Sequence, residues 1–525
     1  MATRAIKLLL QIGAIAVVLA ALPYKLFELD RYFVPKELVL HIVALAVGGL
    51  LLVRRRSVQF DLVDKLIAVF LAWSVASALF STNYWLAQRA LGLSVSSAII
   101  FWGARAVAED DAYRGVLAGC AIATVVVAAT CLLQAYGVET EYFSTNRAPG
   151  GTLGNRNFVA HIAVIGLPSL VWCTVTARRS AQTLAGSFGV AIVAAALVLS
   201  RSRAAWLAVA ASALLLFFPM LASRKYWAGQ KVGGRFARLV LSAVIGAIIA
   251  IVMPNSLNWN SESPYLDSAR AMVDYKKGSG RGRVDQYENS LQMSVRHPLL
   301  GVGPGNWPVE YVRFAPGDDR SLTAEGMTAN PWPSSDWVAF MSERGFVPAI
   351  ALLTAFGAMF MSSLRRWRDL GDGDAVLAQL VLAGTIVSTI VVSAFDVALL
   401  LAAPAFLIWS VVGATSGSRR KNAVEPAATQ KTWSLGVVGA MVILAASVTR
   451  SATQTISMAN VGRGGRTAGW VAGSDWDPGS YRINLKVAQF YMRRGRCATA
   501  RTYARRASHL FPHAREPKRI AESCG

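Results

Sequence analysis

The sequence Gly282-Arg283-Val-Asp-Gln-Tyr287, followed by Arg296-His297-Pro298-Leu-Leu-Gly301-Val-Gly303-Pro304-Gly305-Asn306-Trp307, lies in a polar interruption between two apolar runs. The interruption extends from Pro254 to Asp336. Its glycines at 301, 303 and 305 permit tight turns and positive φ angles. They predict either a surface turn or a place where the backbone approaches a ligand closely.

The segment from Arg283 to Val295 predicts an amphipathic helix inside this interruption. Its apolar residues recur at steps of three and four, and they are Val284, Tyr287, Leu291 and Val295. Such spacing gives the helix one apolar and one polar face. We expect this helix to lie on a membrane surface.

The composition of the 525-residue chain is that of a polytopic membrane protein, with 54% hydrophobic residues and a mean hydropathy of +0.42. A formal charge of +23 would suggest a nucleic-acid partner in a soluble protein, but here many basic residues lie in short loops and indicate topology. The five cysteines lack metal-ligand spacing, and Gly301 to Gly305 lacks the Gly-Lys-Ser/Thr ending of a phosphate loop. We expect no metal, no cofactor, no nucleic acid and no nucleotide-driven chemistry.

Apolar runs of roughly 16 to 22 residues predict an all-α fold with about 12–13 transmembrane helices. The runs start near Ile6, Leu38, Leu62, Leu91, Val116, Phe158, Leu184, Ala204, Leu239, Phe346, Ala375, Val397 and Leu435. The fourth is the weakest, because its apolar part from Leu91 to Trp102 is short and is followed by Arg105.

Basic residues mark the even-numbered loops, as at Arg54-Arg55-Arg56, and the positive-inside rule then places the N-terminus in the cytoplasm. A large loop between the ninth and tenth spans, Asp396 and the C-terminal tail are therefore expected on the periplasmic side of a bacterial inner membrane. The predicted divisions are an N-terminal transmembrane bundle (residues 1–254), the loop with the active-site segment (255–336), C-terminal transmembrane helices (337–448) and a helical tail (458–525).

The tail is polar, basic and helical in pattern. Its small, aromatic and terminating residues have the spacing of a tetratricopeptide hairpin, at Ala488, Tyr491, Gly495, Ala500, Ala507 and Pro512. Since helical repeats commonly present binding surfaces, the tail predicts a partner among polysaccharide-assembly proteins. Cys497 and Cys524 could form a disulfide in an oxidising compartment.

Two further polar strings fall on the same predicted side. Asn155 or Asn157 could cap the span that starts near Phe158. Arg201 and Arg203 break the positive-inside trend, which predicts a phosphate or carboxylate partner for them; the alternative is a solvated or snorkelling pair. His161 lies inside an apolar span and is expected to be a hydrogen-bonded core residue.

Taken together, these strings resemble the O-antigen ligase and polymerase family. The resemblance rests on the order of the strings and on the long loop, and it covers roughly residues 62–414. The strings are Gly151 to Ala160, Ser202-Arg203-Ala-Ala-Trp206, Gly282-Arg283, Pro298 to Asn306 and Glu343-Arg-Gly345. A tetratricopeptide-like tail is also met in this family and in its protein-glycosylating relatives.

The resemblance implies a metal-independent glycosyltransferase with an all-helical, GT-C-like membrane fold. Its donor would be a glycan on undecaprenyl diphosphate, and its acceptor would be a hydroxyl of a lipid, glycan or protein on the periplasmic face. Arg203 and Arg283 match the family's diphosphate-binding arginines, and guanidinium groups suit phosphate oxygens. Further predicted substrate-binding residues are Arg201, Arg281, Asn155, Arg156, Asn157, Asn306 and Glu343.

The chain departs from the family at one position. The family usually carries a histidine about nine residues before the glutamate that aligns with Glu343, where this chain has Ser334-Ser335-Asp336. Asp336 is the first candidate for the base that receives the acceptor proton, ahead of Glu325, Glu343 and His297. The alternative for Asp336 is a helix N-cap before Trp337.

Three functions stay open on the sequence alone. The first is transfer or polymerisation of glycan as an O-antigen or exopolysaccharide ligase or polymerase. The second is an O-oligosaccharyltransferase that acts on protein. The third, from another class, is a membrane scaffold or transporter of the polysaccharide machinery; a transporter predicts ionisable residues near span centres and related halves, and neither is evident.

Overall fold

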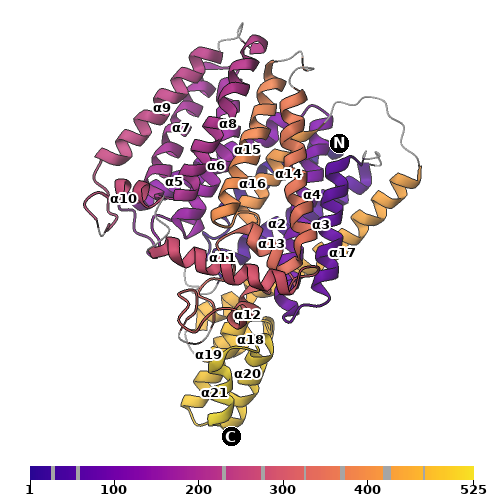
Figure 1. Cartoon of the computed structure of the whole chain (residues 1–525), viewed down its shortest axis with the longest axis vertical. Coiled ribbons are helices and arrows are strands. Elements are labelled where there is room, and N and C mark those ends of the chain that lie inside the picture. The colour runs from indigo at the N-terminus through magenta and orange to yellow at the C-terminus, as the bar shows by residue number, and fades with distance from the viewer. Residues whose placement is uncertain are drawn as a thin grey trace.

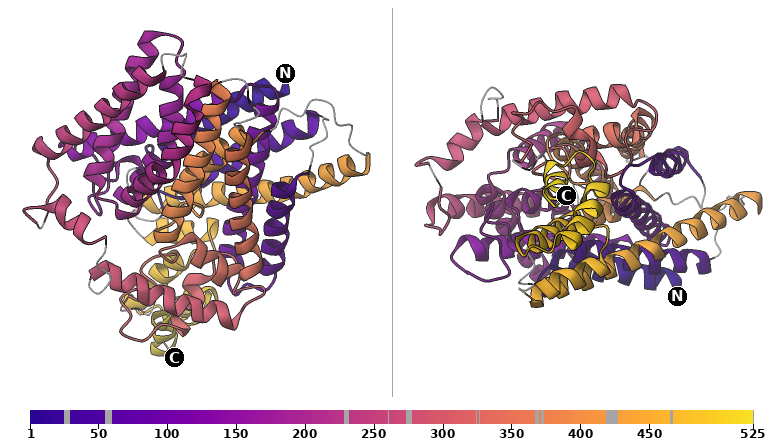
Figure 2. Two further views of the ribbon diagram at one scale, coloured as in Figure 1. Left: turned by 45° about the horizontal axis from the view of Figure 1, so that its top comes forward. Right: turned by 90° about the horizontal axis from the view of Figure 1, so that it is seen from below.

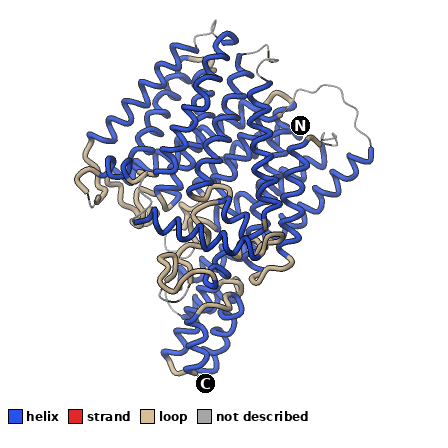
Figure 3. The backbone as a smooth tube through the Cα atoms, in the orientation of Figure 1, coloured by secondary structure: helices blue, strands red, loops and turns tan. Residues whose placement is uncertain are grey.

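The structure is a computed structural model and describes residues 1–24, 30–54, 60–227, 232–259, 261–272, 278–323, 325, 327–366, 370, 373–417, 427–464 and 467–524. In these residues every regular element is a helix, apart from one isolated β-bridge between Leu322 and Thr328. Figure 3 shows the helices and the loops that join them. The predicted all-α membrane fold is confirmed.

The described residues contain eleven helices that are long and apolar enough to cross a membrane, fewer than the predicted 12–13. They are α1 (Ala2–Leu19), α2 (Val34–Arg54), α4 (Tyr84–Glu109), α5 (Tyr113–Ala135), α6 (Arg156–Val175), α7 (Ser180–Ser200), α8 (Arg203–Trp227), α9 (Val232–Val252), α14 (Phe346–Arg366), α15 (Gly373–Phe395) and α17 (Ala427–Gly464). The predicted third and twelfth spans form shorter helices, α3 (Leu62–Ala78, 17 residues) and α16 (Ala402–Ser416, 15 residues). Their length accounts for the difference.

These helices lie side by side around one apolar core that takes residues from both ends of the sequence (Figure 1). The N-terminus and the C-terminus lie at opposite ends of the molecule, as the views of Figures 1 and 2 agree. The end nearer the C-terminus, below called the loop end, carries the short elements between the spans. These are η1 (Gly151–Leu153), α10 (Pro264–Arg270), α11 (Gly278–Arg296), α12 (Trp307–Glu310), η2 (Tyr311–Arg313) and α13 (Asp336–Arg344).

Helix α4, the weakest predicted span, is a continuous helix of 26 residues and is the most deeply buried of the eleven. Its charged residues are paired inside the bundle. Nη1 of Arg105 lies 2.8 Å from Oδ1 of Asp64 on α3, and Nε of Arg89 lies 2.8 Å from Oε2 of Glu37 on α2. This span can therefore have a low hydropathy because other helices, not lipid, surround it on most sides, and paired charges are tolerated between helices.

Glycine permits the closest helix contacts, as small residues do in other membrane bundles. A Cβ atom on Gly246 of α9 would lie 2.2 Å from the carbonyl oxygen of Ala191 on α7. A Cβ atom on Gly413 of α16 would lie 2.3 Å from the carbonyl oxygen of Phe101 on α4. Both helix pairs therefore pack backbone against backbone.

Helix α11 crosses the loop end of the bundle (Figure 1) and confirms the helix expected from Arg283 to Val295. Gln286, Ser290 and Met293 are buried, whereas Leu291 and Val295 are exposed. The buried residues of α11 are thus mostly polar, with Met293 as the apolar exception, and Leu291 and Val295 of the predicted apolar face point outward. This orientation suits a helix at a membrane surface, which stays a prediction.

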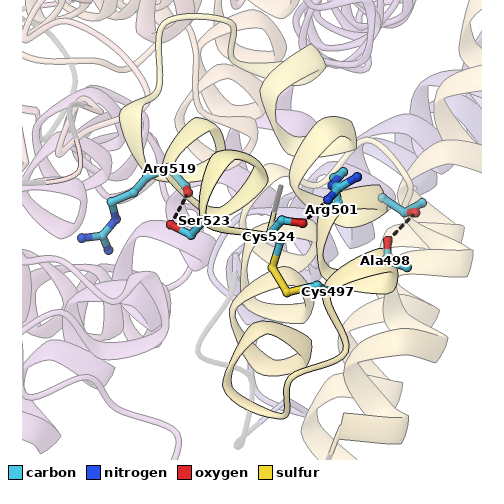
Figure 4. Close-up of a disulfide and its surroundings, with 7 residues drawn as sticks. Cys497, Ala498, Arg501, Arg519, Ser523 and Cys524 are labelled. Carbon is cyan, nitrogen blue, oxygen red and sulfur yellow. Dashed lines mark hydrogen bonds between the residues drawn. A yellow bond between two sulfur atoms is a disulfide. The ribbon is translucent and has the colours of Figure 1, made fainter.

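The C-terminal domain consists of α18 (Thr467–Trp476), α19 (Tyr481–Arg493), α20 (Cys497–Leu510) and α21 (Arg515–Ser523). Helix α17 leads into it, since α17 continues to Gly464, beyond the residue 448 at which the last transmembrane segment was expected to end. A disulfide joins Cys497 to Cys524, and Arg501 donates a hydrogen bond to the carbonyl oxygen of Cys524 (Figure 4). The tetratricopeptide likeness and the domain boundaries stay predictions.

Candidate functional site

Two arginine side chains share the ring of Trp259 at the loop end. The guanidinium carbon of Arg201 is 4.6 Å from the ring centre, and that of Arg156 is 5.2 Å from it. Cation–π contacts hold guanidinium groups in place without neutralising them. Neither arginine forms an ion pair with another described residue, although Asp267 acts on Arg201 from a greater distance. We call Arg156, Arg201 and Trp259 the arginine–tryptophan cluster.

The junction of α7 and α8 positions Arg201 and Arg203. Helix α7 ends at Ser200, and Arg201 adopts the left-handed conformation with φ of 52° before α8 begins at Arg203. Nε of Arg201 donates a 2.7 Å hydrogen bond to Oγ of Ser268, and Arg203 donates to the carbonyl oxygen of Ala271. Both arginines are therefore partly buried against the α10 segment.

The N-terminus of α6 lies beside the cluster and presents three predicted residues. Asn155 is the N-cap, because its side chain accepts a 3.0 Å hydrogen bond from the backbone N–H of Asn157. The capping prediction is confirmed for Asn155. Arg156 contacts Trp259, and Nδ2 of Asn157 donates a 3.1 Å hydrogen bond to Oδ2 of Asp396, which follows α15.

Helix α11 brings Arg283 to the same region. Arg283 is half-buried and acts electrostatically on His161 of α6, and it has no hydrogen-bond or ion-pair partner among the described residues. Arg281 is different: its side chain is 57% exposed, and its Nε lies 2.8 Å from Oδ1 of Asp285. Of the two, Arg283 is the one left available for an anion.

The glycine-rich loop lies against α13. Glycines 301, 303 and 305 have positive φ angles, and Oε2 of Glu343 accepts a 2.8 Å hydrogen bond from the Gly305 N–H. Asn306 is buried and bonds both backbone groups of Asn83, with its Oδ1 accepting and its Nδ2 donating. Through these contacts Glu343 and Asn306 hold the glycine-rich loop against its neighbours. Substrate contact by either residue stays a prediction.

Asp336 is buried at the start of α13. Its carboxylate accepts hydrogen bonds from the backbone N–H groups of residues 398, 399 and 400, at 2.8, 2.9 and 3.1 Å. The N-cap of α13 is Ser335, so the expectation that Asp336 caps this helix is wrong by one residue. Burial raises the pKa of Asp336 to about 6, although these hydrogen bonds favour its charged form. A role as base stays a prediction.

Three residues of this region escaped the sequence analysis as site candidates. Trp259 lies in a loop without periodic signal, and Asp396 meets Asn157 only through folding. His161 is buried as expected, but neither ring nitrogen has a hydrogen-bond partner among the described residues. Its Nε2 lies 3.6 Å from Oδ2 of Asp396.

Comparison with known protein families gives a match to part of the chain. Residues 188–353 match the family model described as O-antigen ligase. That segment contains both arginines of the α7–α8 junction, α11, the glycine-rich loop and α13, whereas the N-terminus of α6 and Asp396 lie outside it. No curated protein matches the chain.

Proposed function

We propose that this chain, whose residues 188–353 match the family model described as O-antigen ligase, transfers glycan from undecaprenyl diphosphate to an acceptor hydroxyl. The supporting observation is the convergence, on the N-terminal turns of α6, of guanidinium groups that form no ion pair with a described residue. Arg156 of α6 belongs to the arginine–tryptophan cluster, and Arg283 acts electrostatically on His161, little more than one turn further along the helix. A helix N-terminus adds its own preference for anions.

In this proposal Arg203 and Arg283 bind the diphosphate of the donor. As the bond between the anomeric carbon and the phosphate oxygen breaks, negative charge grows on the leaving diphosphate. Fixed guanidinium groups stabilise that charge more in the transition state than in the ground state, which accelerates the reaction. Arg201 and Arg156 contribute positive charge from the cluster, and Arg281 has a smaller part because Asp285 already pairs with it.

The remaining assignments follow from the same proposal. The loop end faces the periplasm, the spans cross the bacterial inner membrane, and no metal ion or cofactor takes part. The acceptor is a lipid, a glycan or a protein hydroxyl, and the C-terminal domain contacts other polysaccharide-assembly proteins. Asp336 stays a candidate for the base that receives the acceptor proton.

The experiment is complementation of a strain that lacks this gene. Wild type should consume the lipid-linked glycan and restore finished product, whereas Arg203→Ala and Arg283→Ala should leave the lipid-linked glycan to accumulate. Arg281→Ala should retain most activity. Arg519→Ala is the matched control, because this arginine is 70% exposed in the C-terminal domain. Full restoration by both Arg203→Ala and Arg283→Ala would support the scaffold or transporter function instead.

A further inference from the structure

The acceptor hydroxyl needs a base, and the carboxylates on α13 are poorly placed for that task. Asp336 is buried with three backbone N–H groups on its oxygens. Glu343 is also buried, and it accepts the Gly305 N–H. An acceptor that reached either group would first have to displace the hydrogen bonds that hold the loop end together.

A different carboxylate lies beside the start of α13. The hydroxyl of Tyr287 on α11 is 2.7 Å from the carbonyl oxygen of Ser334 and 3.0 Å from that of Ala394. Ser335 in turn donates a 2.9 Å hydrogen bond to the carbonyl oxygen of Ser393. Ser334 and Ser335, which stand near the position of the family histidine, are therefore held against the end of α15. Asp396 lies at the same place, because it follows Ala394 by two residues.

The carboxylate of Asp396 is oriented but not enclosed. Oδ1 accepts a 2.9 Å hydrogen bond from the Val397 N–H, and Oδ2 accepts the 3.1 Å bond from Asn157. Its side chain is 13% exposed, in contrast to those of Asp336 and Glu343. The carboxylate of Asp396 is thus fixed in direction by two hydrogen bonds, and part of its side chain is exposed.

His161 of α6 lies close to this carboxylate. Its ring is fully buried, and a buried ring nitrogen without a hydrogen bond is costly unless a partner is close. Nε2 of His161 lies 3.6 Å from Oδ2 of Asp396, and the backbone of Val397 also lies close to the ring. The positive charge of Arg283 also acts electrostatically on the His161 ring. Asp396 is therefore faced by an imidazole and an amide from α6, with a guanidinium from α11 nearby.

We propose that Asp396 is the base of the transfer reaction and that His161 and Asn157 are positioning residues for its carboxylate. This inference rests on the proposed function. The acceptor O–H bond breaks and its proton goes to Oδ2 of Asp396, while the oxygen electron pair forms the new bond to the anomeric carbon. The bond from that carbon to the diphosphate oxygen breaks, and its electrons leave with the lipid diphosphate. The proton then passes to solvent.

The test uses the full chain in lipid nanodiscs with the lipid-linked glycan extracted from the gene-deletion strain as donor and the acceptor fraction of that strain. Asp396→Asn should lower kcat by about 10²- to 10⁴-fold, the usual contribution of a general base, with KM for the donor little changed. Asp396→Glu, which keeps a carboxylate, should recover part of the rate. Asp374→Asn is the matched control, since Asp374 starts the same helix, α15, and pairs with Arg114 at its other end.

His161→Gln should lower kcat by a smaller factor, with KM unchanged, and should move the acid limb of the dependence of kcat on pH. A purely structural histidine would change the amount of folded protein but leave that limb in place. If wild type consumes the donor and Asp396→Asn does so at a similar kcat, the assignment of Asp396 is wrong while the transferase function stands. If wild type leaves the donor intact, the proposed function itself has failed.

Discussion

Oε2 of Glu343 accepts a hydrogen bond from the backbone N–H of Gly305 at 2.8 Å, which fastens the glycine-rich loop to α13. The backbone carbonyl of Glu343 also accepts the N–H of Gly303, at 2.8 Å. Asn306 continues the attachment to Asn83 at the start of α4. One loop therefore holds the segment after α11, the start of α4 and α13 in fixed relation.

Gly301→Ala should destabilise this attachment strongly. Its φ angle is +63°, and an added Cβ atom would lie 2.2 Å from the backbone carbon of Glu343. The backbone conformation alone should cost about 1–3 kcal/mol. Gly282→Ala is the control, because nothing lies within 4 Å of its Cβ position and the residue is inside a helix. Thermal unfolding in detergent should show a lower apparent Tm for Gly301→Ala only; equal Tm values would contradict the attachment.

Glu343 should make stability depend on pH. Burial raises its pKa to about 7, above the ordinary value of 4.5. The folded state therefore holds this proton more tightly than the unfolded state, so stability falls as pH rises from about 4.5 to 7. Glu343→Gln cannot titrate, so its apparent Tm should decline less than that of wild type between pH 5 and pH 8. Parallel declines would show that this carboxyl group does not titrate in that window.

The ion pair between Arg450 and Asp477 should anchor the C-terminal domain. Arg450 lies on α17, both side chains are buried, and the Arg450 guanidinium carbon is 4.4 Å from the ring centre of Trp85 on α4. Removing one partner leaves a buried charge unpaired, which costs about 3–5 kcal/mol. Asp477→Ala should therefore speed hydrogen exchange or proteolysis in α18 to α21.

The pair between Arg519, which is exposed, and Glu516, which is partly buried at the surface, provides the comparison for that anchor. It is separated by three residues within α21, and such surface pairs contribute about 0–1 kcal/mol. Arg519→Ala should leave exchange in the domain near the wild-type rate. An equal effect of the two substitutions would contradict an anchoring role for Asp477.

The disulfide between Cys497 and Cys524 should stabilise the C-terminal domain independently of the bundle. The two cysteines are 27 residues apart, and closing a loop of that length contributes about 3.5 kcal/mol in the chain-entropy model. Reductant should increase proteolysis of α20 and α21 in wild type and have no further effect on a Cys497→Ser/Cys524→Ser variant. Cys173→Ser, at a free cysteine in α6, should behave as wild type. Resistance of reduced wild type would contradict this contribution.

The spans were predictable because each needs a long apolar run, and all thirteen predicted runs form helices. Helix α4 was the weakest of the predicted spans, because a charged side chain such as Arg105 is unfavourable in a membrane unless it has a partner. Its partner Asp64 is 41 residues away in the sequence, so the pairing that permits this charge appears only in the folded bundle.

The candidate site was predictable in part. Arginines that break the positive-inside trend could be found from topology, and the structure holds Arg201 near Arg156. A polar or glycine-rich motif, however, does not reveal whether its residues bind substrate or hold the backbone, and only the structure shows that Asn306 and Asp336 accept hydrogen bonds from backbone N–H groups. Asn157 and Asp396 are 239 residues apart, so no local pattern joins them.

The most direct measurement of the central claim is release of undecaprenyl diphosphate by the purified chain, followed by mass spectrometry. The protein would be held in nanodiscs with lipid-linked glycan from the gene-deletion strain and with the acceptor fraction of that strain. The account predicts that wild type releases the lipid diphosphate in step with glycan transfer, and that Arg203→Ala and Arg283→Ala each slow release by about 100-fold or more. Equal release by wild type and both variants, or none by wild type, would contradict it.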